Sequence, residues 1–323
     1  MSLQTEEFEA RTEPHRGELV AFCYRMLGSL HDAEDVVQET FLRAWRGYGE
    51  FEFRASIRTW LFRIATNQCL NLLQHSSRRL IPSALGSPGD PREIAPAASD
   101  LPWLEPFPDL LFAPPPADPG VLVVERQSLR LALVAALQYL PPRQRAVLVL
   151  REAFGWPAAE VAELLGTTAA AVNSALQRAR AELTRAAPDE ELLTEPAESD
   201  RRALLDQYAT AFEKADLESL NRLLADEVRW EMPPIPTWFE GRDDVLELLR
   251  RKLDPRAKRR LVPVSANAQP GFAVYDEVGG RLRAHMLQVV TIGSGGIRAI
   301  HSFHRPDLFP SFGLPLQTTV GLP

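Results

Sequence analysis

The stretch Pro157–Gly166, PAAEVAELLG, followed by 167–183, TTAAAVNSALQRARAEL, predicts two helices joined by a sharp turn. Gly166 suits the turn, because glycine adopts a left-handed backbone conformation without steric cost. The threonine pair 167–168 precedes the second helix, where hydroxyl groups cap free backbone N–H groups. Val172 and Leu176 are expected to face inward. The spacing therefore predicts a helix-turn-helix.

The outward face of the second predicted helix carries small polar residues and an arginine. They are Thr168, Asn173, Ser174, Gln177 and Arg178. A recognition helix uses small polar side chains to contact base edges and arginine to hold phosphates. An ordinary helical hairpin in a protein core would share the backbone pattern, but the exposed polar stripe favours DNA binding.

Charge is unevenly distributed along the 323 residues, whose net charge is −7. Residues 43–79 hold seven arginines against two glutamates, and residues 122–186 hold eight arginines against five glutamates. Between these blocks, residues 82–121 contain one arginine and six acidic residues. Two basic blocks around an acidic segment indicate two nucleic-acid contacts on one chain, although solvated helices often carry arginine as well.

A second motif is the stretch 32–45, DAEDVVQETFLRAW, which predicts an amphipathic helix with Asp32 as its cap. Its acidic and amide face comprises Asp32, Glu34, Asp35, Gln38 and Glu39. Its other face is apolar and includes Leu42 and Trp45. Taken alone, this pattern is common among helices that simply expose a negative surface.

A third motif mixes aromatic and basic residues in what is expected to be the next helix and the segment before it. Its members are Tyr48, Phe51, Phe53, Arg54, Arg58, Trp60 and Arg63, with Asn67, Asn71, Arg78 and Arg79 beyond them. Aromatic rings among arginines suit unstacked single-stranded bases and their phosphates. Trp60, in the same stretch, is expected to be a core residue.

Residues 81–121 are dense in Pro, Ser, Ala and Gly and show no hydrophobic period. Such a segment cannot bury enough apolar surface to order itself, so a linker is expected. It contains an apolar island with Trp103, Leu104 and Phe107. Apolar residues in a tether indicate that the tether docks on another surface.

The C-terminal third changes to an α+β pattern. Helices are expected over Leu204–Leu224 and Asp243–Leu253, and strands over Val228–Met232, Leu261–Asn267, Gly271–Tyr275, Arg283–Ile292 and Ile297–His304. Helices followed by hairpin-linked strands predict a curved antiparallel sheet wrapped on helices. The Pro- and Gly-rich end is expected to be an extended tail.

Together the three N-terminal motifs resemble the extracytoplasmic-function (ECF) sigma factors of the sigma-seventy family, over roughly residues 8–187. The strings DAEDVVQETFLRA, LPPRQRAV and QRARAEL carry the resemblance. It implies that Asp32, Asp35, Gln38 and Glu39 bind the β′ clamp helices of core RNA polymerase. It also implies a contact with the β flap, minus-ten promoter recognition by Tyr48 through Asn71, and minus-thirty-five recognition by the helix-turn-helix. Asn173 and Ala175 stand where the family often has Lys and Arg, which implies weaker upstream contacts.

The C-terminal third resembles SnoaL-like domains, a cone-shaped fold. Tyr208, Phe212, the run 228–234 and the run 238–243 carry the resemblance. A subgroup of ECF sigma factors has such a domain, which regulates the sigma core in cis, and the linker stretch 100–106, DLPWLEP, loosely matches that subgroup's linker motif. The resemblance implies a pocket for an unknown small molecule; the candidate lining residues are Tyr208, Trp230, Trp238, His285 and His301.

The expected architecture is therefore multidomain. Residues 1–80 and 122–187 form two all-α sigma domains (a helical bundle and a helix-turn-helix), 81–121 a linker, 200–310 an α+β cone and 311–323 a tail. No spacing forces an acid–base pair into contact, so no catalytic residue, cofactor or metal is expected. Cys23 and Cys69 are expected to be buried thiols. No apolar run could span a bilayer, so the cytoplasm is expected.

Two other functions fit parts of the sequence. One is an enzyme that converts a small molecule and is fused to a DNA-binding segment. The other is a stand-alone helix-turn-helix repressor, which would need a dimer interface, although no long heptad is present. The acidic helix at 32–45 argues against both, since neither function requires it.

Overall fold

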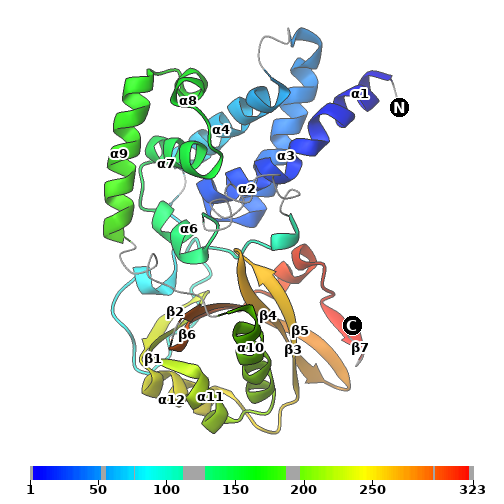
Figure 1. The fold of residues 1–323 in the computed structure, drawn as a ribbon. Coiled ribbons are helices and arrows are strands. Elements are labelled where there is room, and N and C mark those ends of the chain that lie inside the picture. The colour runs from blue at the N-terminus through cyan, green and yellow to red at the C-terminus, as the bar shows by residue number, and fades with distance from the viewer. Residues whose placement is uncertain are drawn as a thin grey trace. The chain divides into compact units, whose positions relative to one another are not determined.

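The computed structural model describes residues 3–51, 56–75, 77–111, 128–186, 197–293 and 295–319. The chain forms two compact units, and their sequences alternate (Figure 1). The first unit is Met1–Arg79 with Leu111–Pro188, and the second is Leu80–Leu110 with Asp189–Pro323. The first is helical and the second is α+β, so the predicted fold class is confirmed.

Four helices form the first half of the helical unit: α1 (Leu3–Thr12), α2 (Arg16–Leu27), α3 (Leu30–Gly47) and α4 (Ile57–His75). Gly28 ends α2 in a left-handed conformation, with φ of 70°. The prediction that Asp32 caps α3 is wrong. The hydroxyl of Ser29 caps this helix by accepting the Asp32 N–H at 3.1 Å. Asp32 lies in the first turn, where a negative charge favours the helix dipole.

The second half contains α6 (Leu131–Leu137), α7 (Pro142–Leu148), the π-helical turn η5 (Val149–Ala153), α8 (Ala158–Leu165) and α9 (Ala169–Ala186). The predicted helix-turn-helix is confirmed as α8 and α9. Gly166 ends α8 with φ of 62° and ψ of 46°. The Thr168 hydroxyl accepts the Ala171 N–H at 3.2 Å, so Thr168 caps α9 as expected.

The second unit builds one curved sheet against three helices (Figure 1). Its helices are α10 (Glu198–Glu213), α11 (Leu217–Leu223) and α12 (Arg242–Lys252). Its strands are β1 (Leu224–Met232), β2 (Ile235–Glu240), β3 (Arg259–Ala266), β4 (Gln269–Val278), β5 (Arg281–Gly293), β6 (Gly296–Phe303) and β7 (Gln317–Thr319). The strand order is β2-β1-β6-β5-β4-β3, and β7 pairs with β5.

Three details of this unit differ from the expectation. The sheet is not wholly antiparallel, because β1 and β6 run parallel. The expected helix Leu204–Leu224 is two helices, since Ala215 has φ of 53° and Asp216 caps α11 by accepting the Ser219 N–H at 3.1 Å. The strand β2 was not predicted, because its proline interrupts the hydrophobic alternation.

The C-terminal end is part of the domain rather than an extended tail. Pro306–Phe312 forms the 3-10 helix η7 and buries Leu308, Phe309 and Phe312. The ring of Phe309 packs edge-on against Tyr275, with centroids 5.1 Å apart. Among the residues that the structure describes, no helix has the length and apolar character needed to cross a membrane.

Candidate functional site

The second helix of the helix-turn-helix, α9, presents a polar face. Val172 and Leu176 are buried, while Thr168, Asn173, Ser174, Gln177 and Arg178 are exposed together, as the sequence predicts. Arg180, on the flank, is held by Glu152 through its Nε at 2.8 Å. The side chains that could reach base edges are therefore free to do so, and Arg178 has no ion-pair partner among the described residues.

The acidic face of α3 is only partly free. Asp35 and Gln38 are exposed, and Glu39 pairs with Arg43 at 2.6 Å. Asp32 forms an ion pair with Arg79. Asp35 and Gln38 therefore have no such partner among the described residues, and the paired Glu39 lies on the same side of the helix, within one turn of them.

Sequence reasoning missed the apolar part of this surface. Leu42 and Trp45 are 45% and 37% exposed, although they belong to the face expected to be buried. They border a groove of ≈ 470 Å³ between α1 and α3, which Gln38 also lines. Exposed large apolar groups beside an acidic face are typical of a protein-binding surface.

The helix α4 carries most of the residues predicted to recognise the minus-ten element. Asn67 and Asn71 are exposed one turn apart. Tyr48, just before this helix, is buried beside Phe8, with ring centroids 5.2 Å apart. Trp60 is only half-buried, and it stacks on Phe51 at 4.5 Å, so the expectation of a core position is wrong. Phe53 and Arg54 lie outside the described residues.

Two predicted DNA-binding arginines of α4 are engaged within the helical unit. The Nε of Arg58 donates to the Glu18 carboxylate at 2.9 and 3.0 Å, and its guanidinium lies over the Trp156 ring at 4.9 Å. Arg63 pairs with Glu163 of α8 at 2.9 Å. Both contacts join α4 to other parts of the helical unit rather than leaving the arginines free.

Two buried arginines hold the two halves of the helical unit together. Arg145, 3% exposed, donates to Gln138 Oε1 at 2.7 Å and to the Met26 carbonyl. Burial lowers its pKa to about 10, so it stays charged at neutral pH. Arg25 donates to the Ser128 hydroxyl at 2.9 Å. A buried cation is costly unless its donors are bonded, and both terminal guanidinium nitrogens of Arg145 are, although its Nε is not.

Aromatic rings fill the space between the same two halves. Phe62 of α4 lies 5.1 Å from Trp156 and 5.5 Å from Phe154, and Phe22 of α2 lies 5.9 Å from Phe154, measured between ring centroids. Packing of this kind is typical of a protein core. The two helical halves therefore form one packed body in this structure.

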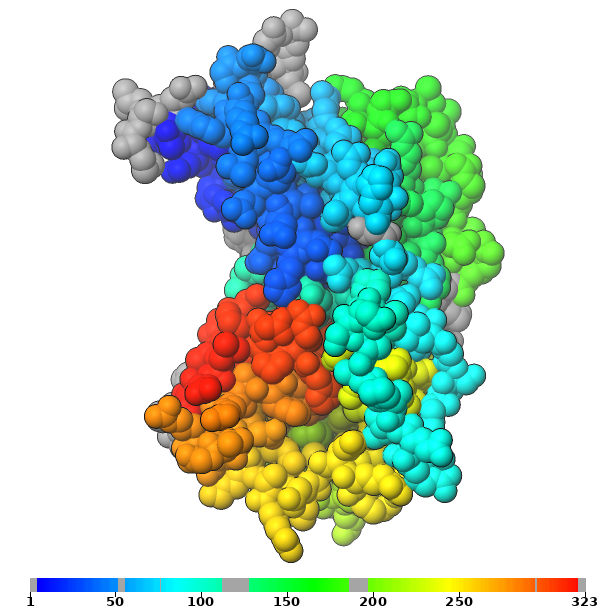
Figure 2. Space-filling model, turned by 180° about the vertical axis from the view of Figure 1, so that it is seen from behind, coloured from blue at the N-terminus to red at the C-terminus, as the bar shows by residue number. Residues whose placement is uncertain are grey.

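Residues 80–110, here called the strap, are irregular but bonded along the second unit. The N–H groups of Gly89 and Ala98 donate to the carbonyls of Trp238 and Pro234 at 2.8 and 2.9 Å. These bonds run beside the edge strand β2, and Figure 2 shows the strap, cyan to turquoise, lying along this domain. An edge strand offers unpaired backbone groups, which the strap satisfies.

The apolar island of the strap is buried. Trp103, Leu104 and Phe107 are 6%, 1% and 0% exposed. The backbone of Phe107 exchanges two hydrogen bonds with Asn267, both of 2.8 Å. Trp103 donates its indole N–H to the Ala98 carbonyl at 2.7 Å, within the strap. The strap is therefore an ordered part of the second unit, not the unstructured segment expected.

A buried acid–histidine pair lies under the strap. Glu231 and His301 approach to 3.4 Å, and the Ser83 N–H donates to Glu231 at 3.0 Å. Burial alone would raise the pKa of Glu231, but its bonds to His301 and Ser83 hold the pKa below the usual value. Trp238 donates to the Gly86 carbonyl at 2.9 Å. Trp238 and His301 thus belong to the strap side of the sheet.

The five predicted pocket residues are not brought together. Tyr208 and Trp230 lie in the apolar core, on the sheet face opposite Glu231, since neighbours along a strand alternate. Tyr208 donates to Gln288 at 3.0 Å. His285 lies elsewhere, 3.3 Å from Asp276 and with its ring 5.2 Å from that of His304. Among the described residues no acidic, Cys or His cluster could hold a metal ion.

His304 makes the second unit sensitive to pH. Burial lowers its pKa from 6.5 to about 4, and the positive charges of His285 and Lys252 act in the same direction. At a pH between these two values, His304 binds a proton in the unfolded chain but stays neutral in the folded chain. Stability should therefore fall by about 3 kcal/mol as the pH drops from 6.5 to 4. Urea unfolding at pH 7 and pH 5 should show about 2 kcal/mol of this loss for the natural chain but not for His304→Gln. An unchanged pH dependence in that variant, or its loss in His75→Gln, would contradict the assignment.

A bundle followed by a helix-turn-helix, with an acidic helix and a free recognition face, defines a sigma-type transcription initiation factor. Family models agree: Sigma-70 region 2 matches residues 12–79, Sigma-70 region 4 matches 130–183, and a SnoaL-like domain matches 205–300. The chain belongs to the ECF RNA polymerase sigma factors. The alternative of a small-molecule-converting enzyme fused to a DNA-binding module is set aside, because the sigma-factor relatives span the whole chain.

Two relatives and one solved structure illustrate this membership. The ECF RNA polymerase sigma factor SigG of Mycobacterium tuberculosis is 45% identical over 96% of this chain and 84% of its own length. SigJ of the same species is 29% identical over 98% of this chain and 95% of its own length. The crystal structure of Mycobacterium tuberculosis SigJ superposes with a TM-score of 0.62 at 25% identity, covering 97% of this chain and 99% of that one.

Proposed function

We propose that this sigma factor binds core RNA polymerase through α3, contacts promoter DNA through α4 and α9, and is controlled in cis by its C-terminal domain through the strap. The observation that carries the proposal is the strap itself. It is covalently continuous with the sigma regions on both sides, yet it is hydrogen-bonded to the C-terminal domain at several points. Any change in that domain can therefore act on the chain that joins the two promoter-binding regions.

The polymerase contact is assigned to the surface made by Asp35, Gln38, Glu39, Leu42 and Trp45 of α3. Carboxylates and exposed apolar groups together suit a basic, partly apolar partner, and the family resemblance supports the β′ clamp helices. The same resemblance supports a contact between residues 128–186 and the β flap. A small-molecule ligand of the C-terminal domain stays a prediction.

The helical unit, as seen here, is closed. The minus-ten and minus-thirty-five elements are about 25 base pairs apart, or roughly 85 Å at 3.4 Å per base pair. Two helical halves with aromatic rings in contact cannot reach both elements at once. Promoter binding therefore requires them to separate, which also releases Arg63 from Glu163 and Arg58 from the Trp156 ring.

Substitutions in α9 test this assignment through transcription by reconstituted holoenzyme. Asn173→Ala or Gln177→Ala should cost about 1–3 kcal/mol at particular base pairs of the upstream element, because base-edge bonds are lost. Arg178→Ala should instead weaken binding evenly across sequences and flatten its salt dependence by about one phosphate contact. A changed base preference in Arg178→Ala, or no effect of any of the three, would contradict these roles. Arg180→Ala is the matched control, since Glu152 already holds that arginine.

A further inference from the structure

A run of basic residues marks the connection between α12 and β3. Seven of the eleven residues 250–260 are Lys or Arg, one is Asp, and two of the three lysines of the whole chain are among them. The protein as a whole has a net charge of −7, so this run stands out against its background. None of the predicted DNA contacts includes it.

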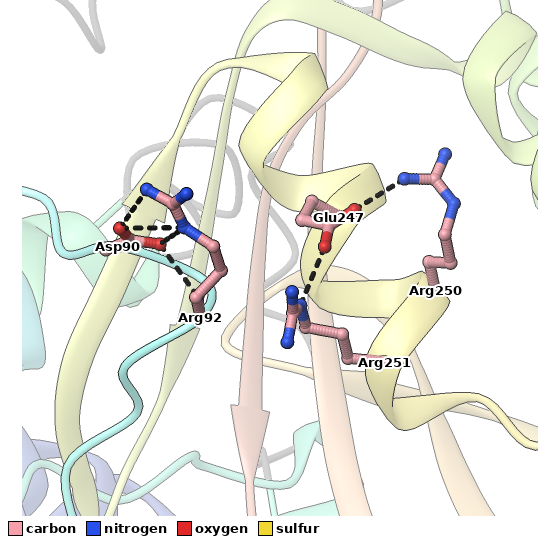
Figure 3. Close-up of polar contacts among 5 residues, drawn as sticks. All are labelled: Asp90, Arg92, Glu247, Arg250 and Arg251. Carbon is pink, nitrogen blue, oxygen red and sulfur yellow. Dashed lines mark hydrogen bonds and ion pairs between the residues drawn. The ribbon is translucent and has the colours of Figure 1, made fainter.

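Four cations of this run are more exposed to solvent than the carboxylates with which they pair. Glu247 bonds Arg250 at 2.5 Å and Arg251 at 2.7 Å, at the end of α12 (Figure 3). Its side chain is 30% exposed, against 62% and 45% for the two arginines. Lys258 and Arg260 likewise reach outward over the less exposed Glu277 and Glu213, at 3.6 Å each. The solvent-facing groups of the run are therefore mainly cationic, although each of these cations pairs with a less exposed carboxylate.

The side chains of two cations of the run form no ion pair with any described residue. Lys252 and Arg256 are exposed, and within the described ranges no carboxylate lies within ion-pair distance of either. Figure 3 shows a further pair nearby, in which Arg92 of the strap is bonded to Asp90 at 2.6 Å. That arginine is neutralised by its own neighbour, so it adds no free positive charge.

The stability of the fold explains only some of the basic residues in this run. Cations at the end of α12 favour the helix dipole, which explains Arg250 and Arg251. Charges on an edge strand discourage pairing with another chain, which explains Arg259 on β3, held by Asp276 at 3.4 Å. Neither reason requires Lys252, Arg256, Lys258 and Arg260 to be exposed together.

We infer that Lys252, Arg256, Lys258 and Arg260 form a surface on the C-terminal domain that binds the phosphate backbone of duplex DNA. Exposed Lys and Arg side chains without base-reading neighbours fit sequence-independent phosphate contacts. The run exposes no large apolar side chain that could enter a bilayer, since Leu253 is buried, so DNA is favoured over a lipid surface. The choice of DNA rests on the sigma-factor function, which brings this chain to promoters.

The covalent structure makes such a contact effective even if each phosphate contact is weak. Only residues 76–79 separate α4 from the first residue of the strap. When α4 is bound at a promoter, the C-terminal domain is therefore held at a high effective concentration near the same DNA. A few phosphate contacts would then lengthen the lifetime of the promoter complex.

The test uses the full chain with a fluorescent duplex of arbitrary sequence. The variant Lys252→Gln, Arg256→Gln, Lys258→Gln, Arg260→Gln should lose at least about tenfold in affinity at 0.1 M salt. Its slope of log affinity against log salt should be smaller by about 3–4, close to 0.9 per phosphate contact. A control variant removes the same number of positive charges from four ion-paired arginines elsewhere in the domain, of which three are exposed and Arg298 is half-buried. The changes are Arg202→Gln, Arg222→Gln, Arg229→Gln and Arg298→Gln. The control variant should leave affinity and slope nearly unchanged.

Three results would overturn the inference. The first is an unchanged affinity and slope in the 252–260 variant. The second is an equal loss in the control variant, which would mean that only net charge matters. The third is loss of binding to phosphatidylglycerol vesicles without any change on DNA. Arg178→Ala in the same assay separates this inference from the proposed function, because its slope should fall by about one whether or not the C-terminal domain contacts DNA.

Discussion

Phe107→Ala and Trp103→Ala are each expected to destabilise the second unit by roughly 3–5 kcal/mol, because both side chains are buried and nothing else fills their space. For a unit of this size, the thermal midpoint should fall by about 2–4 °C per kcal/mol. The two changes together should detach the strap, since the Phe107–Asn267 backbone bonds depend on the packing around them. Calorimetry of the full chain would measure the shift.

The strap itself offers a matched control for this pair. Leu85 and Leu110 are 43% and 61% exposed, so Leu85→Ala with Leu110→Ala should change the midpoint little. A functional readout completes the test. Promoter-dependent transcription should change several-fold in the Trp103/Phe107 variant, while co-purification with core polymerase persists. If transcription were unchanged despite the lower midpoint, the strap would have a structural role only.

Reversing charge on α3 should abolish holoenzyme formation. Asp35→Lys with Glu39→Lys replaces two carboxylates on the acidic face of α3 by cations. Attraction to a basic partner then becomes repulsion, so the affinity for core polymerase should fall at least about a hundredfold. Helicity should be nearly unchanged, because both positions point to solvent or are half-buried at the surface. Co-purification with core polymerase, together with circular dichroism, measures both quantities.

The control for this variant lies on the second unit. The control is Asp206→Lys with Glu218→Lys. Asp206, like Asp35, has no ion-pair partner among the described residues. Glu218 forms an i,i+4 ion pair with Arg222, as Glu39 does with Arg43. The control variant should leave polymerase binding intact. Undiminished holoenzyme with the α3 variant would show that the polymerase contact lies elsewhere. A second variant, Leu42→Ala with Trp45→Ala, should weaken binding without any change of charge.

Capping residues, glycine and apolar spacing correctly predicted the helices whose ends depend on nearby residues. Gly166, the threonine cap at 168 and the apolar spacing placed α8 and α9 within a residue or two of their positions. The exposed stripe of α9 followed from the same periodicity. By contrast, the break at Ala215 and the parallel pairing of β1 with β6 depend on contacts between residues far apart in sequence. Periodicity carries no information about such contacts.

The strap and the engaged arginines show where sequence reasoning stops. Part of what holds the strap is backbone groups that bond to Trp238, Pro234 and Asn267, and backbone groups leave no compositional trace. Arg58 and Arg63 were predicted as DNA contacts from residue type, but whether a surface arginine meets a phosphate or a carboxylate depends on its spatial neighbours. Glu18 and Glu163 are 40 and 100 residues away, respectively, so nothing in the local pattern indicated them.

The alternation of the two units along the chain has a consequence for synthesis on the ribosome. The strap residue Gly86 is made 152 residues before Trp238, its hydrogen-bond partner. At roughly 5–20 residues per second, the strap waits on the order of 8–30 s before β2 exists. During this interval the nascent chain has its region-2 helices and, later, its helix-turn-helix, but no C-terminal domain. On the proposed function, chains that end prematurely near residue 190 would lack the domain that controls the sigma regions.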